Sequence, residues 1–521
     1  MNKKHSALLL AGLLQTGIFL AGPAIFTSCA STQIAEGEEL VEYKNVHYSV
    51  YNKTQLTEQE LREDCDMLKY VLYNTYAGID EAISLGFDLD ATIEEIYQET
   101  LKKKELGYYK AGDFQATAAR IMSKNLTNSD QHLTISGYSI KDPLLLFYSK
   151  IYFEKNGEKY FVKKSEDENI KEGMEFTGPE KNLFEILSDD GILYRYGVLT
   201  SKKLKTALLS VNNETYTVKV ENEKSIFTKS SWTGLKETKE TLYMSLGDCD
   251  QVFGITDSSA LSTSYWDKYL NNIAKAAQGK KNIIFDLRSN PGGYFQFPAK
   301  MISAAYYNQH MDSDYQNNMQ SLFINKICNN CTMLVSPFTM QSEKEWLEKS
   351  LKDQFSLYKP EVVEYFKDYW KHMKYNPIRK HIPLDYFETS FEDFPEPDFK
   401  GNVYVLINRG TASAAEFGTG MTYLLQDKGI NVHIIGENSW GGIKYGGMWS
   451  NSMPNSGLWV RAGIYFGESP IVQNNPNWHG EGNGWFPDYW ATNDTILNTL
   501  ENLTEDTEIK TILAGLGKEL L

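Results

Sequence analysis

The sequence lacks an excess of positive charge. Its 521 residues contain 52 lysines and arginines against 68 aspartates and glutamates, for a formal net charge of −16 at pH 7. A nucleic-acid-binding chain usually presents a basic face, so we expect no nucleic-acid partner. Hydrophobic residues make up 41% and charged residues 23% of the chain, which is the composition of an ordinary globular protein. The length allows two to four domains.

One run of mostly apolar residues, 7–26, stands out at the N-terminus. It follows Lys3 and Lys4, and together they form the pattern of a secretory signal. An uncleaved membrane anchor is the alternative, because the run is nearly long enough to span a bilayer. Gln15 and Pro23 weaken that alternative.

The end of this segment, FTSC, resembles a bacterial lipobox, with Phe26 in place of the more usual leucine. The resemblance implies a lipoprotein-type signal over 1–29, cleavage before Cys29 and a lipid on its thiol. We therefore expect an exported cell-envelope protein that meets the membrane through this lipid. Ordinary secretion is the alternative.

Cysteine is scarce, with five in the chain. Cys328 and Cys331 form a single C-x-x-C pair, CNNC. A zinc site normally needs a second pair or accompanying histidines, and neither is evident. We therefore expect no zinc site at this pair, and the sequence implies no other metal and no organic cofactor. In an exported protein the pair favours a local disulfide, and buried thiols are the alternative.

The patterns of apolar and turn residues divide the remaining chain into five segments. They are a polar tether (30–54), a helical region (55–140), a β-rich module (141–238), an α/β core (239–500) interrupted by an insertion or lid (305–397), and a C-terminal helix (501–521).

The helical region begins with a capping-box pattern. Thr57 is a plausible N-cap, and Glu60 follows three residues later. Two further helices are expected over 91–104 and 111–124. In the β-rich module, the Asn-Gly step in KIYFEKNGEKYFVKK predicts a hairpin.

The core alternates strands with helices. KNIIFDLR, NVYVLIN and NVHIIGE read as buried strands, and residues 265–277 and 414–425 read as helices. This alternation predicts βαβ crossovers and a largely parallel sheet. Within the 305–397 insertion, SEKEWLEKSLKDQF predicts one helix.

Two motifs lie where buried strands end. In FDLRSNPGGYF, the paired Gly292 and Gly293 can turn their N–H groups toward a ligand, or they can simply form a tight turn. In NRGTASAAEFGTGM, Ser413 precedes a helix whose first-turn N–H, on Ala414, would face an oxyanion. Ser413 can equally be a simple N-cap.

Two further residues are candidates for acid–base chemistry. Glu481 lies in the glycine-rich segment HGEGNGWFPDYW, where a carboxylate can orient a histidine or remain a solvated loop residue. His132, in NSDQHLTISG, closes the helical region. A lone histidine is more often structural than catalytic.

The order DLRxNxGG, TASAAE, IGENSWGG and ExxGxxPD resembles the tail-specific, or C-terminal processing, serine peptidases, and most of all their tricorn-core-like branch. The resemblance covers about 240–490. It implies a crotonase-like α/β core and a serine endopeptidase that acts on peptide or protein substrates. A degenerate PDZ domain around IKEGMEFTG is also implied, with a plain β-insertion as the alternative.

By the same resemblance, Ser413 is the nucleophile, His132 of the D-x-H segment is the general base, and Glu481 is the orienting carboxylate. Ala414 and either Gly292 or Gly293 would form the oxyanion hole. The base would titrate near the ordinary histidine pKa of about 6.5.

A second branch of these peptidases uses a lysine as base. Gly442 occupies that lysine's place here, and Lys444, two residues on, reads as a surface residue. Gln131 stands where the tricorn-like branch can have a serine. Two alternative functions stay open, a catalytically silent lipid- or peptide-binding protein on the same fold and a non-peptide ester hydrolase.

Overall fold

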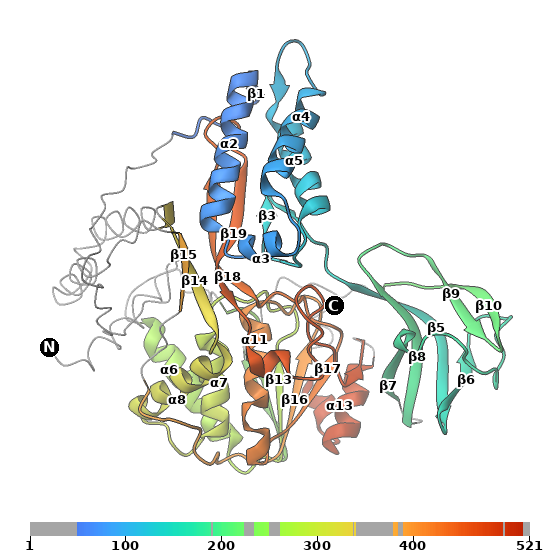
Figure 1. Ribbon diagram of the computed structural model, residues 1–521. Helices are drawn as coiled ribbons and strands as arrows, with labels where there is room; N and C mark the ends of the chain where they lie inside the picture. The colour runs from blue at the N-terminus through green and yellow to red at the C-terminus, as the bar shows by residue number, and fades with distance from the viewer. Residues whose placement is uncertain are drawn as a thin grey trace.

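The computed structural model describes residues 49–188, 191–222, 234–249, 261–336, 338–339, 379–383, 389–492 and 495–513. The expected signal with Cys29, most of the tether, and the helix expected at 342–355 lie outside these residues. Figure 1 shows three parts, with a helical region above the α/β core and a β-rich module beside it. No helix within the described ranges is long and apolar enough to cross a membrane.

The core contains a six-stranded sheet of order β11-β12-β13-β16-β17-β20. The strands from β12 to β20 are parallel, and β11 is an antiparallel edge. The sequence prediction of an α/β core with parallel strands is confirmed. The strand bounds are β11 (Gly234–Glu237), β12 (Thr241–Ser245), β13 (Asn282–Asp286), β16 (Asn402–Ile407), β17 (Asn431–Gly436) and β20 (Tyr489–Trp490).

Alternate residues of these strands enter two different apolar clusters. In β16, Val403 and Val405 face one cluster with four helices, while Tyr404 and Leu406 face the other cluster with α13 (Ile496–Thr504). Because both faces are covered, the strands read as continuous apolar runs. The four helices of the first face are α6 (Leu261–Ala277), α7 (Gln296–Tyr306), α8 (Ser313–Ile327) and α11 (Ala414–Thr422).

The helical region contains the three expected helices and one short additional helix. The capping box is confirmed, since Thr57 Oγ1 accepts from the N–H of Glu60 and Glu60 Oε2 accepts from the N–H of Thr57. The helices are α2 (Glu58–Thr75), α3 (Ile79–Ser84), α4 (Leu89–Leu101) and α5 (Ala111–Asn125), with a small ladder of β1 (Gln55–Leu56) and β2 (Tyr109–Lys110) at their far end.

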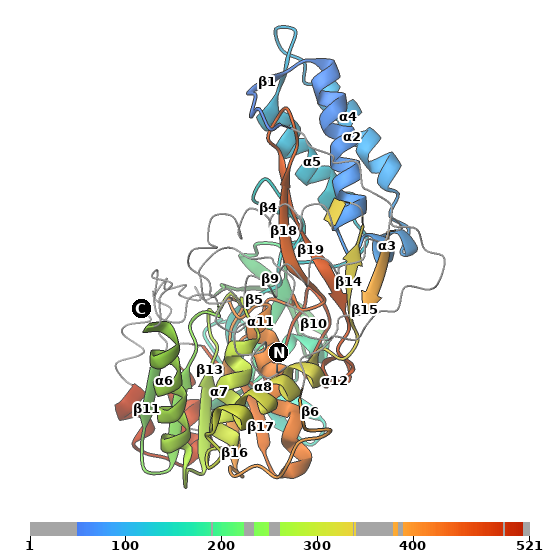
Figure 2. The same ribbon diagram turned by 90° about the vertical axis from the view of Figure 1, so that its left-hand side faces the viewer.

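A second sheet joins the helical region to the core. Its order is β15-β14-β19-β3-β4, and β18 also pairs with β19. Figure 2 shows the long β18–β19 hairpin rising from the core along the helices. The strand bounds are β3 (Thr134–Ile135), β4 (Tyr138–Ser139), β14 (Cys331–Val335), β15 (Lys380–Pro383), β18 (Tyr445–Ser452) and β19 (Trp459–Gly467).

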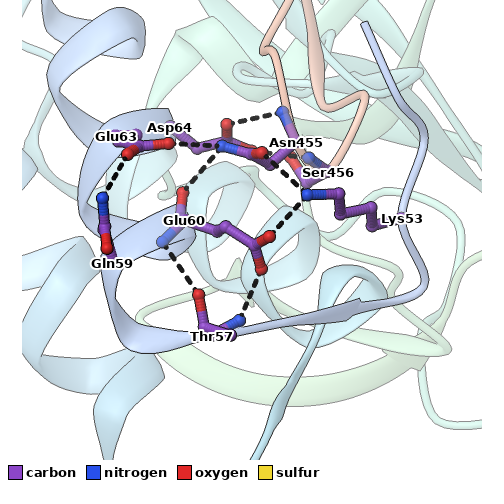
Figure 3. A network of polar contacts seen from close by, with 8 residues as sticks. All are labelled: Lys53, Thr57, Gln59, Glu60, Glu63, Asp64, Asn455 and Ser456. Carbon is purple, nitrogen blue, oxygen red and sulfur yellow. Dashed lines mark hydrogen bonds and ion pairs between the residues drawn. The ribbon is translucent and has the colours of Figure 1, made fainter.

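Polar contacts attach the tip of this hairpin to the first two turns of α2 (Figure 3). The fully buried Asp64 accepts hydrogen bonds from the N–H groups of Asn455, at 2.8 Å, and Ser456, at 2.7 Å. Lys53 also donates to Glu60 at 2.5 Å. A charged acceptor here satisfies two buried backbone donors of the hairpin turn.

The β-rich module contains the expected hairpin, formed by β5 and β6. Its four-stranded sheet has the order β6-β5-β8-β7, and a separate hairpin, β9–β10, packs with it. The elements are β5 (Leu145–Asn156), β6 (Lys159–Ser165), the 3₁₀ turn η1 (Glu180–Asn182), β7 (Leu183–Ser188), β8 (Gly191–Thr200), β9 (Thr206–Val211) and β10 (Glu214–Lys219).

The described parts of the 305–397 segment belong to the body of the protein. Helix α8 buries Leu322, Phe323 and Ile327 in the main core cluster, and β14 pairs with β19. Cys328, which caps α8, and Cys331, at the start of β14, are both thiols. The favoured disulfide is therefore not found, and the alternative of thiols holds. A hydrogen bond with the Cys331 side chain, together with burial, raises the pKa of the Cys328 thiol.

Candidate active site

Ser413 lies on a sharp turn between a parallel strand and a helix. β16 ends at Ile407 and α11 begins at Ala414. Ser413 has φ 55° and ψ −119°, a conformation that costs energy for a residue with a side chain. A nucleophilic serine on a strained strand–turn–helix junction presents its hydroxyl at the sheet edge. The geometry therefore exceeds what a simple N-cap requires.

The glycine turn after β13 packs directly against Ser413. A Cβ on Gly292 would lie 2.6 Å from Ser413 Cβ and 3.0 Å from Ala414 N. This approach is possible only without a side chain, and Gly292 has φ 94°. The two motifs that ended neighbouring strands in the sequence thus meet at one point, because parallel strands present their carboxyl ends at one edge.

The two glycines differ in what their N–H groups contact. The N–H of Gly292 donates to Asn290 Oδ1 at 2.9 Å, so it is already used inside the turn. Within the described residues, no acceptor is found for the N–H groups of Gly293 and Ala414. Of the two glycines, Gly293 is therefore the better candidate for an oxyanion donor beside Ala414.

Glu416 connects the serine turn to the loop after β17. Its side chain is fully buried and accepts from the N–H of Ser413 at 3.0 Å and of Gly442 at 2.8 Å. The Ser439 hydroxyl, at 2.5 Å, and the N–H of Gly441, at 2.7 Å, donate to its other oxygen. Burial raises the pKa of Glu416 to about 6, although these donors oppose the shift.

His132 lies between α5 and β3, and strand pairing sets its position. β3 pairs with β19 through Thr134 and Ile135, which brings the histidine loop to the core. The imidazole packs edge-on against Trp440 at a ring separation of 5.0 Å. A Cβ on Gly442 would lie 2.9 Å from His132 Cε1. His132 therefore lies over the same loop that Glu416 holds.

Glu481 reaches the same place from the glycine-rich loop that precedes β20. Its Oε2 accepts from the N–H groups of Ile443, at 3.0 Å, and Lys444, at 2.9 Å. One carboxyl oxygen each of Glu481 and Asp130 and one ring nitrogen of His132 all lie within 4.8 Å of one another. The structure thus brings the expected histidine and glutamate together.

Burial controls the protonation of these groups. It lowers the pKa of His132 to about 3, with a contribution from Arg461, so the expected value near 6.5 is wrong. Burial raises the pKa of Asp130 to about 7. Burial and the nearby Asp130 raise the pKa of Glu481 well above its usual range. The imidazole is consequently neutral at physiological pH.

Lys444 does not lie on the surface, contrary to the sequence interpretation. Its ammonium pairs with Glu81 and Glu468, both at 2.5 Å, and only 13% of its side chain is exposed. These carboxylates raise the pKa of Lys444 despite its desolvation. A lysine committed to two carboxylates is a poor candidate for a general base.

Two participants had no role in the sequence interpretation. Glu416 appeared within TASAAE, and Asp130 within the D-x-H segment, but neither was given a contact. The S-x-x-E spacing from Ser413 to Glu416 is a capping-box signature, which could have indicated the first. Nothing in the sequence indicates that Asp130 meets Glu481, because that contact depends on the tertiary fold.

A strained serine beside backbone N–H groups and a buried histidine–carboxyl cluster is typical of hydrolases with a serine nucleophile. Residues 252–489, a little under half of the chain, match the model of peptidase family S41. Over these residues the chain is similar to the peptidases of family S41, and the protein is a serine peptidase. No curated protein matches the sequence.

Several solved structures are similar along most of their length. One is mature CPAF complexed with lactacystin, at 13% identity over 88% of this chain and 99% of that chain, with a TM-score of 0.41. Another is a putative S41 protease from Bacteroides fragilis, at 12% identity over 87% and 96%, with a TM-score of 0.31. A third is a photosystem II D1 C-terminal processing protease, at 11% over 86% and 96%, with a TM-score of 0.29.

Proposed function

We propose that the protein is an endopeptidase that works through an acyl-enzyme on Ser413, with His132 as general base and Glu481 as its orienting carboxyl group. The observation that carries this proposal is the close packing of Gly292 against both Ser413 and Ala414 N. It supports the proposal because the strained serine lies next to the N–H of Ala414, and the adjacent Gly293 carries the second N–H group that an oxyanion would need.

The chemistry follows from the protonation states. Neutral His132 takes the proton of the Ser413 hydroxyl as the oxygen attacks the scissile carbonyl carbon. Because His132 Nδ1 lies on the side of Asp130, 4.0 Å from its Oδ1, we assign Nε2 as the nitrogen that accepts this proton. The imidazolium then protonates the leaving amine. Water repeats the sequence on the acyl-enzyme and releases Ser413. Each oxyanion donor contributes about 3 kcal/mol to the transition state.

Replacement of the nucleophile tests the proposal. Ser413→Ala should reduce the turnover of unfolded casein at least about 10³-fold while the circular dichroism spectrum is unchanged. Ser469→Ala is the matched control, because Ser469 is also a buried serine at a helix N-terminus, α12 (Pro470–Gln473). Equal turnover by Ser413→Ala and the wild type would remove Ser413 as nucleophile. A wild-type protein that cleaves esters but no peptide would instead favour an ester hydrolase.

We propose that the β-rich module docks against the core of its own chain and does not capture peptides as a PDZ domain does. The edge strand β6 already has a hydrogen-bond partner within the chain, since the N–H of Phe176 donates to the carbonyl of Tyr160 in β6. At the other edge, Phe184 of β7 packs against Trp490 of the core. The core itself we assign to the crotonase-like type, on its parallel sheet and on the motif order.

We further propose that Cys29 carries a lipid and that residues 1–28 are removed, on the strength of the FTSC segment. The intact mass of protein extracted from membranes tests this. The expected mass is that of residues 29–521 plus the lipid. The mass of the full chain, or of a soluble chain with unmodified Cys29, would contradict the proposal.

A further inference from the structure

Three buried polar atoms lie without hydrogen-bond partners on residues that meet over the loop at Gly442. They are Asp130 Oδ2, His132 Nδ1 and Glu481 Oε1, and none has a hydrogen-bond partner in the described part of the chain. Asp130 is fully buried and the His132 side chain is 9% exposed. Burying polar atoms without partners is costly, so such a cluster requires a ligand or a function.

The other atoms of these groups are held by the backbone. Asp130 Oδ1 accepts from the N–H of His132 at 2.6 Å, and Glu481 Oε2 accepts from the N–H groups of Ile443 and Lys444. The two carboxyl groups are thereby held close to the imidazole, with Asp130 Oδ1 at 4.0 Å from His132 Nδ1. Two carboxyl groups at this separation repel each other when ionised, and each binds a proton or a cation more tightly for that reason.

We propose that Asp130, His132 and Glu481 form a binding site for a divalent transition-metal ion, with Zn²⁺ as the best-matched ion, and that the ion inhibits the enzyme. Imidazole nitrogen and carboxylate oxygen are donors that Zn²⁺ accepts, and three protein ligands leave a fourth position for water. Two carboxylates balance the charge of the ion. The donors, within 4.8 Å of one another, must draw together by about 1 Å to reach Zn–ligand distances of about 2.0 Å.

Inhibition follows from the chemistry of imidazole, and this part rests on the proposed function. A metal bound to Nδ1 of neutral His132 places the ring proton on Nε2. A protonated Nε2 cannot accept the hydroxyl proton of Ser413. Glu481, as a ligand, also ceases to orient the ring for proton transfer. The ion therefore removes the base without touching the nucleophile.

Binding is tested without activity, in the full-length Ser413→Ala protein freed of metal with a chelator. Equilibrium dialysis against ZnCl₂ should give one tightly bound ion per chain, and Co²⁺ should produce visible absorption bands. Adding His132→Ala or Asp130→Asn should weaken binding at least about 10-fold. His381→Ala is the matched control, because it removes another His–Asp pair, with Asp80 at 3.1 Å, and should change nothing. Equal binding with and without His132 or Asp130, in folded proteins, would overturn the site.

Inhibition is tested on the metal-free wild type with a peptide substrate. Added Zn²⁺ should abolish turnover at one ion per chain, and a chelator should restore it. Full activity with the site loaded would overturn the inhibitory role. Failure of the proposed function would look different. The metal-free wild type would not cleave peptides, although dialysis would still show one bound ion per chain.

Discussion

The N–H of Ser413 donates to Glu416 Oε2 at 3.0 Å, and the same oxygen accepts from the N–H of Gly442 at 2.8 Å. One carboxylate thus holds both the turn that carries the candidate nucleophile and the loop on which His132 rests. The N–H of Trp440, which donates to the carbonyl of Thr411 at 2.9 Å, joins the same two segments through the backbone. The ionisation state of Glu416 should accordingly control activity.

Activity and stability should respond to Glu416 in opposite directions. The pKa of Glu416 in the folded protein, about 6, exceeds its ordinary value of 4.5. Its contribution to stability is therefore present below pH 4.5 and is lost as pH rises through about 6, a change of about 2 kcal/mol. Activity needs the ionised form with its four donors, so kcat/KM should fall as pH drops through about 6.

Two variants test this pH dependence. Glu416→Gln should have low kcat/KM at every pH and should lack the loss of unfolding free energy between pH 4.5 and 6. Ser439→Ala removes a donor that lowers the pKa of Glu416, so its acid limb should move to higher pH. An acid limb at the same pH in the wild type and in Ser439→Ala would assign it to another group.

The histidine and lysine schemes can be separated by two substitutions. His132→Ala should lower kcat/KM by about 10²-fold or more, because a general base is lost. Lys444→Met keeps the apolar stem of a side chain committed to Glu81 and Glu468, and kcat/KM should stay within about 3-fold. Kinetics on one peptide, with thermal unfolding as the folding control, decide between them. An inactive Lys444→Met beside an active His132→Ala would refute the roles of both His132 and Glu481.

Gly292 should tolerate no side chain. In Gly292→Ala the added Cβ would lie 2.6 Å from Ser413 Cβ and 2.7 Å from the Ala412 carbonyl oxygen. Displacement of the nucleophile by such a clash should cost about 10²-fold in kcat/KM. Gly86→Ala separates the clash from backbone strain, because Gly86 has a similar φ, 96°, and no atom within 4 Å of its Cβ position. It should lose about 1–2 kcal/mol of stability and no activity. Equal kinetics for both variants would refute the packing argument.

The contact between α2 and the hairpin tip should contribute strongly to stability. Asp64→Ala leaves the buried N–H groups of Asn455 and Ser456 without their acceptor, at a cost of about 2–4 kcal/mol. Glu63→Ala is the control, since Glu63 bonds only to polar side chains nearby and should cost less than about 1 kcal/mol. Urea unfolding of both variants measures the difference, and equal midpoints would show that Asp64 is dispensable.

Local rules account for the part of the fold that the sequence predicts. The strands β13, β16 and β17 are buried on both faces and therefore read as apolar runs. The capping box at Thr57 and the Asn-Gly turn depend on neighbours within three residues, so they could also be predicted from the sequence. The order of the motifs indicated Ser413, His132 and Glu481 together as candidate catalytic residues.

The remaining features depend on contacts between distant segments. Lys444 was read as a surface lysine because its partner Glu81 lies in α3, far away in the sequence. The low pKa of His132 arises from burial beneath Trp440 and the neighbouring loops, which no local pattern encodes. For the same reason Glu416 was recognised only as part of a motif, and its four donors, from the serine turn and from the loop after β17, were not foreseen.

The β18–β19 hairpin has a consequence for how activity is lost. It pairs with β3, next to His132, while its tip is attached to α2, so the histidine belongs to the half of the molecule that the hairpin holds in place. The candidate nucleophile and the proposed oxyanion donors lie in turns that follow strands of the core sheet. Detachment of the helical region from the hairpin would therefore move His132 away from Ser413 while the core stays folded. Activity would then be lost by partial unfolding, before the core itself unfolds.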